Sequence, residues 1–268
     1  MKLENITIEE AVEIAGGNKK LYEEKFDKFR QWLKQQVHLP QDISDNRLRI
    51  TLLTSKLNLE KAKKRLDSQY TLRTLLPEFF TNYDPQNDNI ALVHKCLYTC
   101  MLTDVRIDIE EDMVNSDILI ADFAYFTFNH LLKYIPSLVR KIDLCTEAYG
   151  LRYKGIYIIN APSYIGRFLQ LIKTFMSPKI YERVKVFESG IESICEMISK
   201  SNLPADYGGE EPSLEALADM WHAKLLERRE WLLEQEKVKS NESLRTDHVI
   251  NADELFGVNG TFRKLEID

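Results

Sequence analysis

One stretch constrains the fold of this chain more than any other: a short apolar run followed at once by an amphipathic helix. The run occupies residues 155–159, reads GIYII, is apolar on both faces and ends at Asn160-Ala161-Pro162. A run of this length, rich in β-branched residues and bounded by proline, predicts a buried strand of a mostly parallel sheet. Pro162 ends the strand, and Ser163 is expected to cap the helix that follows.

The helix expected after this strand has one apolar stripe. Its apolar residues recur at helical spacing: Ile165, Phe168, Leu169, Ile172, Phe175 and Met176. The polar residues of the segment fall on the other side, and Lys179 and Arg183 follow it. The pattern predicts a buried strand leading into a helix with a cationic outer side. A core strand followed by an ordinary surface helix would give the same pattern.

Composition sets the size and class of the protein. With 268 residues, 44% hydrophobic and 29% charged, the chain suits one large domain, or one domain with a helical appendage. A net charge of −6 argues against a general nucleic-acid binder. No apolar run reaches the ~18–20 residues of a membrane span. We therefore expect a cytoplasmic protein, a monomer without a signal peptide or transmembrane segment, whose membrane contact is peripheral.

The sequence contains no recognisable catalytic constellation. It lacks a G-x-S-x-G motif, a glycine-rich phosphate loop and an H-E-x-x-H motif. His130 could act as a base, but a satisfied core or pocket histidine is the favoured interpretation, and Asp122 is expected to cap rather than to catalyse. Cys96 and Cys100 are four residues apart without a second pair at zinc spacing, so buried reduced thiols are expected. We predict no enzyme, no metal and no cofactor.

Residues 1–85 are predicted to form a helical subdomain. Gly16-Gly17-Asn18 separates two helices, Asp42 or Ser44 can cap a third, and Asn58 can cap a fourth. The fourth helix contains the cations Lys61, Lys63, Lys64 and Arg65. Such a cluster is most often the solvated side of a helix.

Residues 86–237 alternate apolar runs with longer helical patterns and are predicted to form an α/β domain. Strands are expected at 96–103, 117–123 and 155–160, and a helix at 128–148. This order implies a right-handed parallel crossover. Further helices are expected at 163–176, 184–200 and 213–237, the last capped by Ser213. Residues 238–268 are expected to be a tail that is ordered only where it docks.

Several strings resemble the CRAL-TRIO lipid-transfer family, especially its tocopherol- and retinaldehyde-binding members. They are DFAYFTFNHLLKYIP at 122–136, IYIINAP at 156–162, LIKTFMSPKIYERVKVF at 171–187 and LPADYGG at 203–209. The likeness extends roughly from Asp27 to Trp231. It implies an α/β lipid-binding domain with a mostly parallel sheet, preceded by an all-helical subdomain. It also implies that the helix after the N-x-P strand is the gate of a lipid pocket.

The resemblance implies two sets of binding residues. The apolar set would surround a retinoid, tocopherol or other isoprenoid-like lipid: Ile120, Phe126, Phe128, Tyr149, Leu151, Tyr153, Ile156, Ile158, Phe168, Leu169, Ile172, Phe175 and Phe187. The alternative is that these aromatic and aliphatic residues merely fill the core. The cationic set would clamp a phosphoinositide bisphosphate: Arg152, Lys154, Lys179 and Arg183. A solvated charged face is the alternative for this set.

The chain departs from the family pattern at three places. Thirteen residues separate Thr103 from Asp117, where family members have about two more helices. Residues 52–55 read LLTS, where the family often has a basic cluster. In the gate, Thr174 and Tyr181 stand where Pro and Lys are frequent. The predicted function is lipid binding and transfer, with release at a phosphoinositide-containing membrane. The alternatives are a phosphoinositide-reading interaction protein with a reduced or empty pocket and, third, an enzyme that acts on a lipid.

Overall fold

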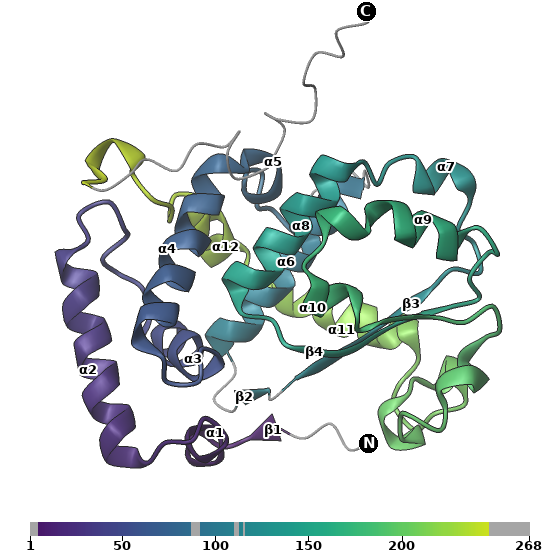
Figure 1. Cartoon of the computed structure of the whole chain (residues 1–268), viewed down its shortest axis with the longest axis horizontal. Coiled ribbons are helices and arrows are strands. Elements are labelled where there is room, and N and C mark those ends of the chain that lie inside the picture. The colour runs from purple at the N-terminus through teal and green to yellow at the C-terminus, as the bar shows by residue number, and fades with distance from the viewer. Residues whose placement is uncertain (1–4, 87–91, 110–112, 115, 247–268) are drawn as a thin grey trace, which may run out of the picture.

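The structure, a computed structural model, describes residues 5–86, 92–109, 113–114 and 116–246 (Figure 1). The N-terminal helices lie at one end of the molecule, and a small sheet with its covering helices lies at the other. Two helical cores and the two faces of the sheet account for most of the buried apolar side chains.

The first core is made by four helices: α1 (Ile8–Ile14), α2 (Lys19–Gln35), α3 (Asp45–Thr54) and α4 (Leu59–Leu75). Ser44 caps α3 and Asn58 caps α4, each accepting a hydrogen bond from the amide three residues on. Both caps were predicted. Phe29, Leu52 and Leu66 are fully buried where these helices meet.

A second core packs α4 and α5 (Pro77–Phe80) against α6 (Leu92–Ile109), α8 (Pro136–Tyr149), α11 (Leu214–Glu227) and α12 (Arg229–Gln235). The strand predicted at 96–103 is wrong, because these residues lie within α6. Leu97, Met101 and Val105 are all buried and recur every four residues. This is helical spacing, which the continuous apolar run obscured.

The sheet has three parallel strands in the order β3 (Asp117–Asp122), β4 (Tyr153–Ile159) and β5 (Val184–Val186). The connection from β3 to β4 passes through α7 (Phe128–Leu131) and α8, so the predicted parallel crossover is confirmed. In the register, Leu119 pairs with Ile156 and Ile158 pairs with Val186. A separate antiparallel pair joins β1 (Asn5–Ile6) to β2 (Met113–Val114).

Three predicted helices differ from the observed elements. The helix at 128–148 is divided into α7 and α8, because Pro136 starts a new helix at its first turn. The helix at 184–200 is wrong: β5 is followed by short 3₁₀ turns at Ile191–Ile194 and Lys200–Asn202. The helix at 213–237 is capped by Ser213 as predicted but is interrupted at Arg228, between α11 and α12.

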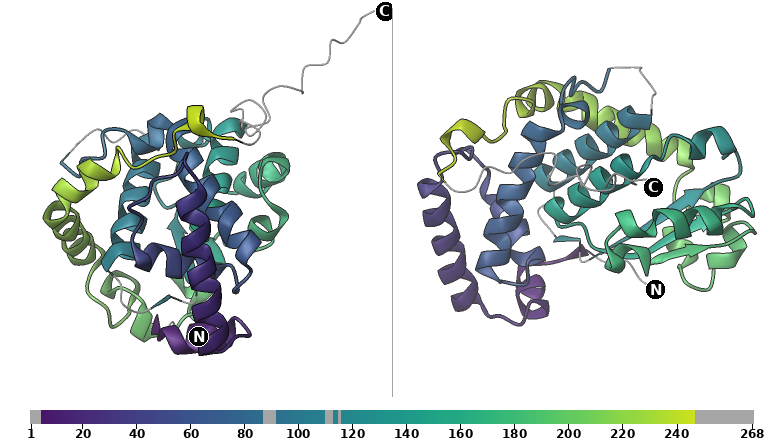
Figure 2. Two further views of the ribbon diagram at one scale, coloured as in Figure 1. Left: turned by 90° about the vertical axis from the view of Figure 1, so that its left-hand side faces the viewer. Right: turned by 45° about the horizontal axis from the view of Figure 1, so that its top comes forward.

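The chain beyond α12 returns to the N-terminal helices. Residues 238–246 cross to α4 and lie along it (Figure 2). The part of the predicted tail that is described is therefore docked. Residues 247–268 lie outside the described residues.

Candidate anion and lipid site

Helix α9 (Ile165–Ile172) packs directly on the sheet. It follows β4 after Pro162 and continues as a 3₁₀ turn at Lys173–Phe175. Tyr164, rather than Ser163, holds the N-cap position, and its side chain makes no capping hydrogen bond. Ile165 is buried with Ile158 of β4, and Phe168 and Leu169 pack against the same cluster. The predicted apolar stripe is therefore confirmed, in a helix shorter than expected.

The predicted lipid-lining residues fall into separate groups. Around α9 and β4 lie Phe126, Ile158, Phe168 and Leu169. Ile120 and Phe187 pack in the cluster of Tyr157 and Ile159, whose side chains alternate along β4 with that of Ile158 and therefore lie on the opposite face of the sheet. Tyr149 and Leu151 belong to the second helical core. The remaining members are Phe128, which is exposed, Ile172, which is buried, and Tyr153, Ile156 and Phe175, which are half-buried.

Side chains occupy the space between α9 and the sheet, where the sequence predicts a lipid cavity. Leu131, Ile158, Ala161 and Ile165 form a buried cluster there, and Phe126 packs against it. The rings of Phe123 and Phe126 stack with centroids 4.1 Å apart. A lipid could occupy this space only after α9 has moved.

A cluster of cations lies beyond the C-terminal end of α9 and comes from three parts of the chain. Lys179 belongs to α10 (Pro178–Tyr181), Arg183 follows it, and Arg152 precedes β4. Lys61 and Arg65 come from α4. Burial and the positive charges of Arg183, Lys61, Arg152 and Arg65, in that order of effect, lower the pKa of Lys179. Cations from three parts of the chain therefore act electrostatically on Lys179.

The cluster has little compensating negative charge. Within the described part of the chain, Lys61, Arg152, Lys179 and Arg183 form no ion pair. Burial lowers the pKa of Arg65; the charge of Glu147 opposes this effect and that of Arg152 adds to it. Converging cations without carboxylate partners are an arrangement that favours binding of an anion such as a phosphate group.

Arg65 is held in place by the junction of α4 with α8. Its Nη1 donates hydrogen bonds to Thr54 (3.1 Å) and Ser55 (2.9 Å), and its Nε donates to the carbonyl oxygen of Glu147 (3.1 Å). Gly150 ends α8 in the left-handed region, at φ 70°, and a Cβ there would lie 3.1 Å from Arg65 Nη1. Glycine therefore permits the close approach of this guanidinium.

Sequence reasoning identified only part of this cluster. Arg152, Lys179 and Arg183 come together as the resemblance implied, whereas Lys154 is exposed on β4 and is not among the charges that dominate the pKa of Lys179. Lys61 and Arg65 were assigned to a solvated helix face. Arg65 contacts Thr54 and Ser55, within the segment that lacks the basic cluster frequent in the family. The signal that could have found them is the four cations within 61–65.

A groove between α4 and α8 adjoins the cluster. Its volume is about 260 Å³. Four cations and one acidic residue line the groove, together with two hydroxyl and three apolar side chains: Lys61, Lys64, Arg65, Arg140, Glu147, Ser68, Thr71, Leu72, Leu144 and Ala148. Cationic surface thus extends along α4 away from Lys179.

The candidate catalytic residues have structural roles. His130 is exposed, and its Nδ1 accepts a hydrogen bond from the Thr127 amide (3.0 Å) at the start of α7. Asp122 accepts from the Ala124 amide (2.9 Å), Asn160 (2.9 Å) and Tyr207 (3.0 Å), and so fixes the turn after β3. No group of three or more potential metal-binding side chains occurs among the described residues.

Comparison with known proteins bears on both parts of the molecule. Residues 18–90 match the family model described as "Pinta-like, UBA domain". Clavesin-1 of Xenopus laevis is 27% identical over 141 residues, which cover 52% of this chain and 42% of that protein. Clavesin-1 of Rattus norvegicus and Clavesin-2 of Homo sapiens match at the same identity, over 39% and 42% of their lengths. The matched region thus spans about two fifths of these curated relatives.

These similarities support the CRAL-TRIO resemblance, because the clavesins are CRAL-TRIO proteins. The small parallel sheet surrounded by helices is consistent with that class. The similarity to clavesins does not support the more specific resemblance to the tocopherol- or retinaldehyde-binding members of that family. Among the described helices, none is both long and apolar enough to cross a bilayer.

Proposed function

We propose that this chain is a non-enzymatic lipid-binding protein that transfers a hydrophobic small molecule to a phosphoinositide-containing membrane. Similarity to clavesins, which belong to a lipid-binding family, supports lipid binding and transfer in general. The ligand that we propose is a retinoid, a tocopherol or another isoprenoid-like lipid, held between the sheet and α9. Side chains fill that space, so we infer that α9 acts as a gate.

The observation that carries the membrane part of this proposal is the cluster of Lys61, Arg65, Arg152, Lys179 and Arg183. Four of these cations form no ion pair with another described residue. Bringing them together costs electrostatic free energy, which a phosphorylated head group would offset. Arginine and lysine together suit a phosphorylated head group. A guanidinium group donates two parallel hydrogen bonds to one phosphate, and an ammonium group acts as a compact positive charge.

Exposed apolar side chains beside α9 supply a second membrane contact. Tyr125 is 92% exposed, and Phe128, Leu132 and Ile135 are more than half exposed on or next to α7. The ring of Phe128 meets that of Tyr164 edge-on at 6.0 Å, which joins this region to the start of α9. Leu171 of α9 is 74% exposed. Such residues favour insertion at a membrane interface.

The membrane contact is tested by reversing the charges of Lys179 and Arg183 together. Juxtamembrane cations contribute about 1 kcal/mol each, so losing two attractions alone should weaken binding roughly thirtyfold, and the repulsion of the two new carboxylates should increase this loss. Binding is measured by co-sedimentation with phosphatidylcholine vesicles that contain a phosphatidylinositol bisphosphate. Lys200→Glu, on an exposed 3₁₀ turn outside the cluster, is the matched control. Unchanged sedimentation of the double variant would show that these charges are only solvated surface.

A second candidate function is a phosphoinositide-reading interaction protein that carries no lipid. The packed space beneath α9 favours it. Organic extraction of the purified protein, followed by mass spectrometry, separates the two. The carrier hypothesis predicts one class of apolar small molecule in near-equal molar amount with the protein. Protein that repeatedly takes up none, even after incubation with retinoid, tocopherol and isoprenoid mixtures, would favour the interaction protein.

A further inference from the structure

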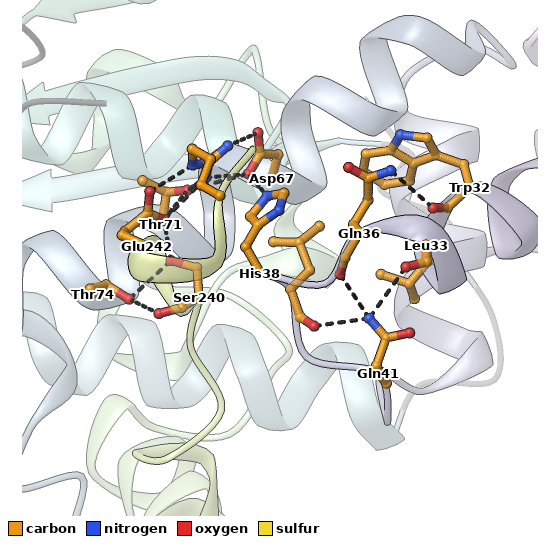
Figure 3. Close-up of polar contacts among 12 residues, drawn as sticks. Trp32, Leu33, Gln36, His38, Gln41, Asp67, Thr71, Thr74, Ser240 and Glu242 are labelled. Carbon is orange, nitrogen blue, oxygen red and sulfur yellow. Dashed lines mark hydrogen bonds and ion pairs between the residues drawn. The ribbon is translucent and has the colours of Figure 1, made fainter. Parts of the chain in front are cut away.

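The segment that follows α12 is bound to α4 at several points. We call residues 238–245 the strap. The amide of Ser240 donates to the carbonyl oxygen of Tyr70 (3.2 Å), and Thr74 Oγ1 donates to the carbonyl oxygen of Ser240 (2.8 Å). The amide of Asn241 donates to the carbonyl oxygen of His38 (2.8 Å). Figure 3 shows Ser240 against Thr74 and Glu242 against Thr71.

The strongest anchor of the strap is Arg245, whose side chain is only 4% exposed. Its Nη1 and Nη2 donate to the two carboxylate oxygens of Asp67, at 2.9 and 2.7 Å, and its Nε donates to Glu242 (2.6 Å). Nη2 also donates to Thr71 Oγ1 (2.7 Å). A bidentate, largely buried arginine–carboxylate pair is among the stronger side-chain contacts. His38 Nε2 lies 3.1 Å from Asp67 Oδ1, the oxygen that also accepts from Arg245 Nη2.

Helix α4 therefore has different partners on two sides. Asp67, Thr71 and Thr74 recur at i, i+4 and i+7 and bind the strap. Lys61, Lys64, Arg65 and Ser68 line the groove toward α8, and Lys61 and Arg65 belong to the cation cluster. Thr71 also lines this groove, so it belongs to both faces. The strap and the anion site thus lie on neighbouring faces of one helix, which meet at Thr71.

The cation cluster creates a repulsion that acts on α4. Burial, and then the positive charges of Arg183, Lys61, Arg152 and Arg65, lower the pKa of Lys179. Glu147 offsets part of the positive charge at Arg65. This repulsion opposes the approach of Lys61 and Arg65 on α4 to the cations of α10 and of the start of β4. The strap binds the neighbouring face of α4 through Asp67, Thr71 and Thr74, and these contacts add free energy that keeps the helix in place. A bound polyanion would remove the same repulsion.

We propose that the strap is a positioning element for the anion site: it holds Lys61 and Arg65 of α4 beside Arg152, Lys179 and Arg183. This inference rests on the proposed function, because it assumes that the cluster binds a phosphorylated head group. Strap docking and head-group binding then favour each other. By thermodynamic linkage the coupling is reciprocal and of equal size in both directions.

The first arm of the test measures binding of a water-soluble, short-chain phosphatidylinositol bisphosphate by titration calorimetry. Arg245→Ala should weaken binding roughly five- to 150-fold, the usual range of such couplings, although Arg245 lies outside the cluster. Arg245→Lys should restore part of the affinity that Arg245→Ala loses. Lys237→Ala is the matched control, because Lys237 directly precedes the strap and pairs with Glu234 at the surface. The side chains of Lys237 and Glu234 are 73% and 67% exposed. It should bind like the wild type.

The second arm measures the reciprocal effect, which a merely structural contact would not produce. Trypsin can cut the chain after Lys237, Lys239 and Arg245 once the strap detaches. Saturating short-chain lipid should slow these cuts in the wild type by about the factor found in the first arm. The protection should be smaller in Thr74→Val, a milder variant that loses only the hydrogen bonds to Ser240.

The outcomes separate this inference from the proposed function. If Lys61→Glu and Lys179→Glu weaken binding but a folded Arg245→Ala does not, the strap has no positioning role and the anion site stands. The same conclusion follows if lipid leaves tryptic cleavage of the strap unchanged. If neither Lys61→Glu nor Lys179→Glu alters binding, the anion site itself is refuted. Should Arg245→Ala fail to fold, Thr74→Val carries both arms.

Discussion

At the scale of single residues, Asp104 links the two helical cores. It lies on α6 with no exposed surface and accepts hydrogen bonds from Arg47 of α3 (2.9 Å) and from Tyr83 (2.7 Å). Arg73 of α4 also donates to it. Burial opposes ionisation of Asp104, but the charges of Arg73 and Arg47 prevail and lower its pKa. One carboxylate thus joins α3, α4 and the chain after α5 to α6.

Replacing Asp104 by Asn should destabilise the protein by about 3–5 kcal/mol, since two guanidinium groups remain buried without a counter-charge. Tyr83→Phe, the matched control, removes one hydrogen bond and should cost about 0.5–1.5 kcal/mol. Urea unfolding at neutral pH measures both. The stabilisation from ionised Asp104 is present above its unfolded pKa of about 3.9 and lost as the pH falls through its lowered folded pKa. The difference from the wild type should therefore shrink in acid; a small, pH-independent difference would contradict this role.

The cation cluster shows what single residues in a sequence can and cannot foretell. Lys179 and Arg183 are four residues apart on one short segment, and their grouping was predicted. Lys61 and Arg65 are more than a hundred residues away from them in the chain, and a helical pattern shows only that such side chains point outward. Which neighbour faces them depends on how α4 packs on α8. The four cations within 61–65 mark a basic face, but the partner of that face is a tertiary property.

At the scale of elements, most predicted caps were correct, whereas apolar runs predicted β3 and β4 correctly but failed at residues 96–103. The caps at Ser44, Asn58 and Ser213 were predicted correctly, because a helix cap is a hydrogen bond between residues only three positions apart in the sequence. The run at 96–103 was assigned to a strand because a fully buried helix is also apolar all round. The parallel crossover was correct because β3 and β4 are short, apolar and far enough apart in sequence to require one.

The helix predicted at 184–200 was wrong for a different reason. Ile191, Ile194 and Ile198 have helical spacing, yet Ile191 and Ile194 lie in one 3₁₀ turn and Ile198 lies in the bend after it. Ile194 and Ile198 are buried against the sheet. Gly190 breaks the segment before the 3₁₀ turn. A spacing of three or four residues fits 3₁₀ turns and helices equally well. Only the packing against Tyr157 and Leu203 decides between them.

At the scale of the whole molecule, α9 joins the two proposed membrane contacts. The exposed apolar residues of α7 meet its first turn, and the cations of α10 follow its end. Ile165 and Ile172 on its inner side are buried. At roughly 1.5–3 kcal/mol for each fully buried side chain, exposing these two to water costs about 3–6 kcal/mol. Opening in bulk water should therefore be rare.

A membrane changes that balance, because the same side chains can enter lipid while Arg167 and Lys173 remain among the head groups. We therefore predict that locking α9 to the sheet abolishes lipid delivery. Cysteines at Leu169 of α9 and Val186 of β5, both packed against the cluster under α9, are joined by a reducible cross-linker in a variant whose native cysteines are replaced by alanine.

Transfer of a fluorescent apolar ligand to vesicles containing a phosphatidylinositol bisphosphate is followed before and after reduction. The locked protein should bind these vesicles normally, since the cations of α10 and α4 are untouched, but should release ligand only after reduction. The uncross-linked double-cysteine variant controls for the two substitutions. A locked protein that delivers ligand as fast as the reduced one would refute α9 as the gate. It would leave the anion site in place, because that site depends on the packing of α4 rather than on movement of α9.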